Sequence, residues 1–265
     1  MSGDQWARLG GGAAATYDAV LEPGMFRPWG DVLVRAGSVA IGDRVLDVAT
    51  GTGVVARAAA SRGARVTGLD FSHDMLERAR VRPDSVGLDW VEASADAMPF
   101  DDGEFDVVLC AHGLQQFPDA PAAVAEARRV LRTGGRVAAC VWAEIEGNPA
   151  MHALVRGLAA RVGAEAADNR RVPFSLGDAD RLLAVLERGG LDEVQVRTQT
   201  ALTDFASTDS FIDAQIAATP LAATGGVDAE ARALLGADVH AALGTAPGEP
   251  LTVPMTALVA TGVAR

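Results

Sequence analysis

The chain has 265 residues, of which 49% are hydrophobic and 22% charged, a composition typical of a globular protein with a substantial core. Its net charge of −12 disfavours nucleic-acid binding, because such a protein needs cationic side chains to neutralise the phosphates. No apolar run approaches the roughly 20 residues that a membrane span requires, and the first residues do not resemble a secretory signal, so we expect a cytoplasmic protein without a membrane partner.

All the basic residues are arginine, and Tyr17 is the only tyrosine in the sequence. The absence of lysine excludes Schiff-base chemistry, a phosphate-binding P-loop and the Tyr-x-x-x-Lys pair of short-chain dehydrogenases. The two cysteines, Cys110 and Cys140, are too few for a disulfide framework or for a zinc site of their own. We therefore expect neither a metal centre nor a lysine-based mechanism.

Residues 1–40 carry apolar side chains at helical spacing, interrupted by Pro23 and Pro28, after a Gly/Ala-rich leader at residues 1–15. We predict an N-terminal helical lid over this segment. Residues 41–145 then alternate between short apolar runs and helical patterns. The expected strands are 44–48, 64–69, 88–91, 105–110 and 136–142, and the expected helices are 54–62, 73–81 and 121–131.

Residues 146–265 add two expected strands, 194–198 and 252–260, and two helical insertions at about 146–190 and 204–248. Nearly continuous apolar strands that alternate with helices indicate a parallel sheet covered on both faces. The chain therefore predicts an α/β fold with a Rossmann-like, seven-stranded, mostly parallel sheet. We expect residues 41–145 to bind a cofactor and the insertions to form a helical cap over the substrate.

A glycine-rich turn follows the first expected strand, where the backbone and the next helix can approach a ligand closely. The spacing Gly51-x-Gly53-x-x-Ala56, followed by Asp70, also fits the fingerprint of a nicotinamide-binding fold. Two features favour an adenosyl ligand with an amino group instead. Helices precede the first strand, and Asp47 within that strand would repel a pyrophosphate but attract an ammonium group.

Motifs further along the chain carry a more specific resemblance. They are Asp47-x-Ala49-x-Gly51-x-Gly53, Asp70-Phe71-Ser72-x-x-Met75-Leu76, Ala95-Asp96-Ala97-Met98-Pro99-Phe100 and Arg129-Val130-Leu131-Arg132-x-Gly134-Gly135. In this order they resemble the class I S-adenosylmethionine-dependent methyltransferases, in the small-molecule branch that includes the ubiquinone/menaquinone-type C-methyltransferases. The chain departs from many relatives at Ala49, where they have glycine, and at Ser94, where they have aspartate.

The resemblance implies S-adenosylmethionine as the cofactor and S-adenosylhomocysteine as its product. It places the ribose hydroxyls on Asp70, the adenine between Phe71 and Met75, and the ammonium group near Asp47, with Tyr17 closing over the cofactor. The implied cofactor-binding residues are Tyr17, Asp47, Ala49, Thr50, Gly51, Thr52, Gly53, Asp70, Phe71, Met75, Ser94, Ala95, Asp96, Ala97, Cys110 and Ala111.

Methyl transfer from a sulfonium is an in-line displacement that needs alignment of the reactants and, for an O–H, N–H or C–H acceptor, a base. His112 follows the fourth expected strand, at the edge where substrates bind, and is the candidate catalytic base. The candidate acceptor-binding residues are Met25, Phe26, Trp29, Gln115, Gln116 and His152.

We therefore predict a biosynthetic methyltransferase that acts on a small, apolar or aromatic metabolite as a monomer or homodimer. Two alternatives stay open at this point. One is a nicotinamide-dependent oxidoreductase, which a cofactor titration would distinguish. The other is a non-methylating protein that retains the cofactor site, which turnover to S-adenosylhomocysteine would exclude.

Overall fold

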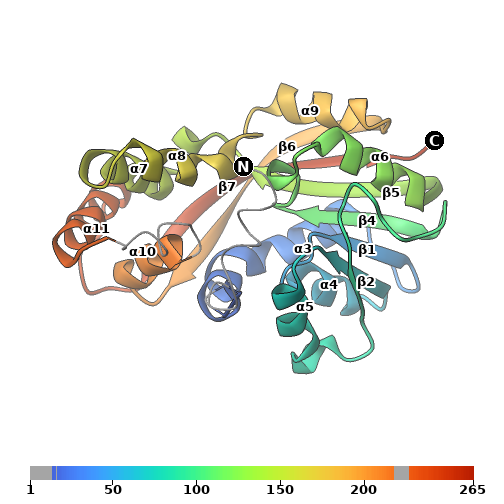
Figure 1. Cartoon of the computed structure of the whole chain (residues 1–265), viewed down its shortest axis with the longest axis horizontal. Coiled ribbons are helices and arrows are strands. Elements are labelled where there is room, and N and C mark those ends of the chain that lie inside the picture. The colour runs from blue at the N-terminus through green and yellow to red at the C-terminus, as the bar shows by residue number, and fades with distance from the viewer. Residues whose placement is uncertain (1–13, 16, 218–226) are drawn as a thin grey trace.

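The expected strands assemble into a seven-stranded sheet, which Figure 1 shows for a computed structural model of the chain. The structure describes residues 14–15, 17–217 and 227–265, so most of the leader expected at residues 1–15 lies outside the described part. The strands are β1 (Arg44–Val48), β2 (Arg65–Asp70), β3 (Asp89–Glu92), β4 (Phe105–Ala111), β5 (Leu131–Trp142), β6 (Asp192–Phe205) and β7 (Leu251–Val263). The predicted Rossmann-like α/β fold class is confirmed.

The order of the strands creates the place where a ligand binds. It is β3-β2-β1-β4-β5-β7-β6, and β7 runs antiparallel to both of its neighbours. β1 pairs in parallel with β2 on one side and with β4 on the other. The chain order therefore reverses at β1, and in open α/β sheets ligands bind at the carboxyl ends of the strands beside such a reversal.

Helices cover both faces of the sheet because side chains alternate along each buried strand. Val45 of β1 belongs to a core shared with α3 (Arg27–Ala36) and α4 (Val54–Ala60), whereas Leu46 belongs to a core shared with α6 (Ala120–Val130) and α9 (Ala179–Arg188). α5 (His73–Arg80) follows β2 and packs against β3. Short 3₁₀ turns lie at Pro83–Ser85, Leu114–Gln116, Ile145–Gly147 and Val172–Phe174.

β6 and β7 are longer than expected and continue past the sheet as a two-stranded ribbon. β7 pairs with β5 from Ala257 to Val263, whereas its pairing with β6 continues to Phe205 opposite Leu251. Phe205, Leu251 and Val253 are buried in the core that also contains residues of α10 and α11. The ribbon therefore supports the helical cap.

The cap consists of α7 (Pro149–Arg161), α8 (Ala164–Arg171), α10 (Thr208–Ala217) and α11 (Ala229–Leu243), which gather at one end of the molecule (Figure 1). α9 does not belong to it, although it lies in the insertion expected at 146–190, because it packs against α6 and β6. Within the segment 1–40 that was predicted to form a lid, η1 (Tyr17–Phe26) is a π-type helix that contacts β6 and α10 and leads directly into α3.

Candidate active site

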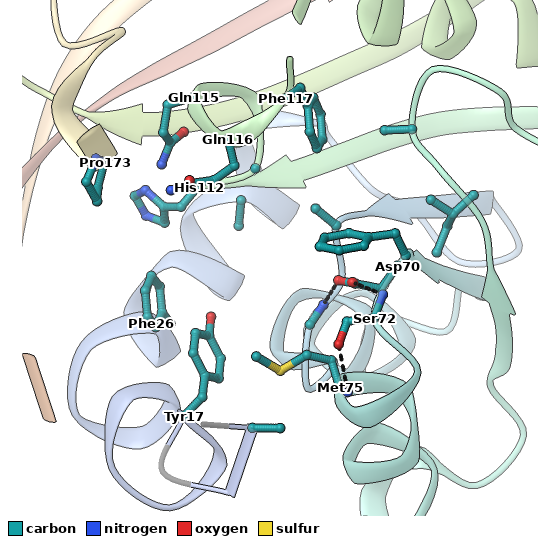
Figure 2. Close-up of a pocket in the computed structure, with 18 of the residues that line it drawn as sticks. Tyr17, Phe26, Asp70, Ser72, Met75, His112, Gln115, Gln116, Phe117 and Pro173 are labelled. Carbon is teal, nitrogen blue, oxygen red and sulfur yellow. Dashed lines mark hydrogen bonds between the residues drawn. The ribbon is translucent and has the colours of Figure 1, made fainter. Parts of the chain in front are cut away.

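A cavity of about 430 Å³ lies at the carboxyl ends of β1, β2, β4 and β5, beneath the lid and the cap (Figure 2). Asp70 lies on one side of this cavity, and Tyr17, Phe26 and His112 lie on the other. The predicted site residues that line it are Tyr17, Met25, Phe26, Ala49, Gly51, Asp70, Phe71, Met75, Ser94, Ala95, Asp96, Ala111, His112, Gln115 and Gln116. The topology thus brings the glycine turn, the end of β2 and the lid to one place.

The Asp70 carboxylate organises the cofactor half of the cavity. Its Oδ2 accepts a hydrogen bond from the backbone N–H of Gly51 at 2.8 Å, and its Oδ1 accepts one from the N–H of Ser72 at 2.9 Å. Burial raises the pKa of this carboxyl group above its ordinary value, while these backbone hydrogen bonds act in the opposite direction. Each oxygen retains a further lone pair, so the carboxylate can still accept hydrogen bonds from a diol.

The next residues along the chain form an apolar shelf beside Asp70. Ser72 caps the N-terminus of α5, because its Oγ accepts a hydrogen bond from the N–H of Met75. Phe71 lines the cavity with 44% of its surface exposed, which core packing does not explain. Met75 lines the same part of the cavity, and Figure 2 shows it pointing from α5 toward Tyr17. This arrangement suits a flat apolar ring.

The lid closes the cavity from the side of the glycine turn. Tyr17 stacks on Phe26 with ring centroids 5.0 Å apart, and a Cβ added to Gly51 would lie 4.0 Å from the Tyr17 hydroxyl. Gly51 has a φ of +56°, a left-handed conformation that glycine adopts without strain. The turn can therefore present its backbone to a ligand held under Tyr17.

His112 lies in an aromatic wall at the other end of the cavity. Its ring stacks on Trp142 with centroids 3.7 Å apart and meets Phe26 and Trp29 edge to face. Its Nε2 lies 3.4 Å from Sγ of Cys140, and its Nδ1 has no hydrogen-bond partner among the described residues. Burial lowers the pKa of His112 to about 3, so the imidazole is neutral at physiological pH.

Eight predicted site residues lie outside the cavity lining, and the structure gives several of them another task. They are Trp29, Asp47, Thr50, Thr52, Gly53, Ala97, Cys110 and His152. Cys110 and Trp29 are core residues on opposite faces of the sheet. His152 lies on α7 in the cap, where it does not reach the cavity. For Ala97 the structure shows an exposed position beyond the cavity and no other role.

Asp47 supports the glycine turn from below and does not line the space for an ammonium group. Its Oδ2 accepts hydrogen bonds from Thr50 Oγ1 at 2.6 Å and from the N–H of Ala56 at 2.9 Å, and burial raises its pKa to about 7. Thr52 Oγ1 is likewise directed inward, where it donates to Glu22, which also pairs with Arg57. These hydrogen bonds hold the turn in place, and a cofactor contact of Asp47 or Thr52 stays a prediction.

Gly53 has a structural role that sequence spacing does not show. Its φ is +90°, and an added Cβ would lie 2.5 Å from Cη2 of Trp90 and 2.9 Å from Nη1 of Arg57. We expect Gly53→Ala to lower the free energy of unfolding by about 1–3 kcal/mol in chemical denaturation. Gly42→Ala is the matched control, because Gly42 has a φ of +83° with nothing within 4 Å of the added Cβ. Equal losses in the two variants would contradict the clash with Trp90.

Several cavity residues were not predicted from the sequence. They are Ala14, Leu21, Leu69, Ser72, Asp74, Ala93, Gly113, Phe117, Pro118, Trp142, Arg170, Pro173 and Gln215. Ser72 lies within a motif that carries the family resemblance, and Phe117 directly follows the predicted residue Gln116. Both could therefore have been predicted. Arg170 and Gln215 come from cap helices distant in the chain, and no local pattern marks them. Within the described ranges, no group of three or more His, Cys, Asp and Glu side chains is placed to hold a metal ion.

Comparison with known proteins agrees with this geometry. Residues 46–139, which run from β1 into β5, match the family model described as a methyltransferase domain. These residues form a methyltransferase domain. For this domain, the predicted resemblance to the class I S-adenosylmethionine-dependent methyltransferases is confirmed. No helix in the described part of the chain is long and apolar enough to cross a membrane.

Curated relatives share substantial sequence identity with the methyltransferase domain. The ubiquinone/menaquinone biosynthesis C-methyltransferase UbiE of Rhizobium johnstonii is 39% identical over 145 residues, which cover 50% of this chain and 56% of that protein. The chain spans about half the length of the curated relatives it matches.

Solved structures extend the similarity beyond the methyltransferase domain. A putative methyltransferase from Bacillus halodurans superposes with a TM-score of 0.60 at 21% identity and covers 89% of this chain and 98% of its own. Phosphoethanolamine N-methyltransferase 2 of Haemonchus contortus, in complex with phosphomonomethylethanolamine and S-adenosylhomocysteine, gives a TM-score of 0.56 at 16% identity, over 89% of this chain and 52% of that one. At these identities the similarity is one of fold.

Proposed function

We propose that this protein transfers a methyl group from S-adenosylmethionine to a small, apolar or aromatic acceptor. The observation that carries the proposal is the Asp70 carboxylate at the carboxyl end of β2. It is held by two backbone N–H groups and lines a cavity beside the exposed ring of Phe71. A carboxylate that accepts a diol, next to a ring that stacks on a base, is a site for an adenosyl group.

The residues at the cofactor end fit such a group. Asp70 would accept the ribose hydroxyls, Phe71 and Met75 would flank the adenine, and Ser94 to Asp96 would lie along its edge. The Gly51 turn would lie against the methionine portion, with Tyr17 closing over it. When bound, S-adenosylmethionine supplies a methyl group activated by its sulfonium charge.

The opposite end of the cavity would hold the acceptor. Phe26 and Trp142 provide apolar walls around His112 and would exclude water from the reacting groups. His112 lines the cavity and is neutral, so its imidazole would orient an acceptor and accept its proton as the methyl group is transferred. Gln115 and Gln116 line the same region and would position the acceptor.

Cofactor identity is the direct test of the proposal. In titration calorimetry we expect S-adenosylhomocysteine to bind at least about 100-fold more tightly than NAD, because the Asp47 carboxylate beneath the Gly51 turn would repel a pyrophosphate. Tight binding of NAD and no heat with S-adenosylhomocysteine would exclude the methyltransferase.

A second measurement distinguishes an enzyme from a protein that only retains the cofactor site. The protein is incubated with labelled S-adenosylmethionine and a panel of aromatic and apolar metabolites, and formation of S-adenosylhomocysteine is followed by mass spectrometry. We expect methyl transfer to at least one member of the panel. Binding without any turnover across the panel would favour the non-methylating alternative.

A further inference from the structure

Arg170 is a buried cation without a carboxylate partner. It lies on α8 in the cap, is 8% exposed and lines the cavity. Its Nη1 donates one long hydrogen bond, of 3.4 Å, to the backbone oxygen of Gln215, and its Nε has no partner among the described residues. No carboxylate of the described chain lies within ion-pair distance of its guanidinium group.

The other buried arginine among the described residues, Arg57, has carboxylate partners. Arg57 pairs with the carboxylates of Glu22 and Asp84 and also donates to the backbone oxygen of Thr52. Burying a cation without such partners costs free energy that the fold must recover from other contacts. Burial lowers the pKa of Arg170 to about 10, so its side chain still carries its charge at physiological pH. Arg170 therefore contributes to the cavity lining a positive charge that has no ion-pair partner among the described residues.

The position of Arg170 relates it to the acceptor end of the cavity. Gln215, which receives its hydrogen bond, places its side-chain Nε2 3.6 Å from the sulfur of Met25 in the lid. Pro173 follows Arg170 on the same segment, and Figure 2 shows it beside His112 and Gln115, across the cavity from Asp70. The segment that carries Arg170 thus lies across the cavity from Asp70.

Other polar atoms at this end also have no partner. Oε1 of Gln115 and Nδ1 of His112 are buried and make no hydrogen bond within the described chain. Buried polar groups in folded proteins are satisfied with few exceptions, so Gln115 and His112 are two under-satisfied side chains among the residues that line the cavity. The walls between them are the aromatic rings of Phe26 and Trp142.

We propose that Arg170 binds a carboxylate carried by the methyl acceptor, so that the substrate class is an aromatic or apolar carboxylic acid. The inference rests on the proposed function, since it concerns the second substrate of that reaction. A guanidinium group matches a carboxylate with two parallel hydrogen bonds. One arginine balances one negative charge, and no second cation of the described chain lines the cavity, which favours a carboxylate over a phosphate dianion.

The ligand-free protein should be less stable because it buries the Arg170 side chain without an ion-pair partner. An arginine retained for a ligand destabilises the fold until the ligand binds, because residues kept for function are often not the most stable choice. We therefore expect Arg170→Met to raise the melting temperature by about 2–4 °C. A lowered melting temperature would instead assign Arg170 a purely structural contact with the last turn of α10, and would overturn the proposal.

Binding is tested on the full chain saturated with S-adenosylhomocysteine. The probes are matched pairs of an acid and its amide: benzoate and benzamide, 3-phenylpropionate and 3-phenylpropionamide, and 2-naphthoate and 2-naphthamide. In wild type we expect at least one acid to bind about 10–100-fold more tightly than its amide, the effect of hydrogen bonds to a charged group. Arg170→Met should remove this preference, and Arg171→Met, at an exposed position on the same helix, should retain it.

The outcomes separate this inference from the proposed function. If wild type does not bind S-adenosylhomocysteine, the proposed function fails. If it binds S-adenosylhomocysteine but prefers no acid over its amide, or if Arg170→Met keeps the preference, only the carboxylate assignment fails. Tighter binding of 1-naphthyl phosphate than of 2-naphthoate would also overturn that assignment. Unchanged S-adenosylhomocysteine affinity in Arg170→Met verifies that the variant is folded.

Discussion

Asp70→Asn is expected to weaken binding of S-adenosylhomocysteine by about 2–4 kcal/mol, or roughly 30–1000-fold. The carboxylate already accepts the N–H groups of Gly51 and Ser72, and its remaining lone pairs would accept the ribose hydroxyls. An asparagine amide offers one oxygen and points its NH₂ group at a backbone donor. The variant therefore loses contacts to the ligand and to the glycine turn together. Titration calorimetry measures the change.

Asp89→Asn is the matched control for this experiment. Asp89 is exposed on the neighbouring strand β3, so its substitution changes the net charge equally without touching the cavity. We expect its affinity to equal that of wild type. If Asp70→Asn also binds as wild type does, Asp70 is not the ribose-binding residue.

The pH dependence of cofactor binding follows from the same carboxylate. Burial raises the pKa of Asp70, and only the ionised form can accept hydrogen bonds from both the backbone and a diol. The contribution of Asp70 to the affinity for S-adenosylhomocysteine should therefore be present above this raised pKa and be lost as the pH falls through it. The fall that belongs to Asp70 should be absent in Asp70→Asn.

Two of the strands that build the site were predictable because each is an apolar run that leads to a glycine turn or ends at an acidic residue. β1 runs into the turn at Gly51, and β2 ends at Asp70. The extension of β6 was not predictable in the same way. Leu202 and Asp204 there are exposed and alternate with the buried Thr203 and Phe205, and the ribbon is stabilised by the cap packed on one of its faces. The length of β6 therefore depends on its packing against the cap, and such tertiary contacts commonly determine where a strand forms.

Two parts of the site were predictable because a short motif marks each of them. They are the glycine turn at Gly51 and the carboxylate of Asp70 at the end of β2. Sequence spacing does not show which side chains line the cavity and which bond beneath the turn, as those of Asp47 and Thr52 do. Arg170, in contrast, is a cavity residue that no sequence pattern marks. An arginine near the end of a polar helix is typical of a solvated surface, and only the packing of α8 in the cap buries it.

His112→Asn is expected to lower kcat by about 10²-fold, the low end of the usual contribution of a general base, because the lowered pKa makes the neutral imidazole a weak proton acceptor. Asparagine is the informative substitution because His112 has a φ of +53°, a left-handed conformation that asparagine tolerates better than alanine does. The variant removes the imidazole while keeping the backbone of the loop after β4. Affinity for S-adenosylhomocysteine should stay near that of wild type, and kcat is measured on the first acceptor found to turn over.

His152→Asn controls for the loss of a histidine as such, since His152 lies outside the cavity, and it should keep the wild-type kcat. The lowered pKa of His112, about 3, fixes the sign of the pH effect. The base acts in its neutral form, so the rate should rise with pH through about 3 and show no limb from His112 between about pH 5 and 8.

Added imidazole should partly restore the rate of His112→Asn by entering the space left in the wall beside Trp142. If the variant instead keeps most of kcat and shows a raised KM or a lower melting temperature, His112 only packs against the acceptor, and catalysis rests on alignment of the reactants, which in-line methyl transfer permits.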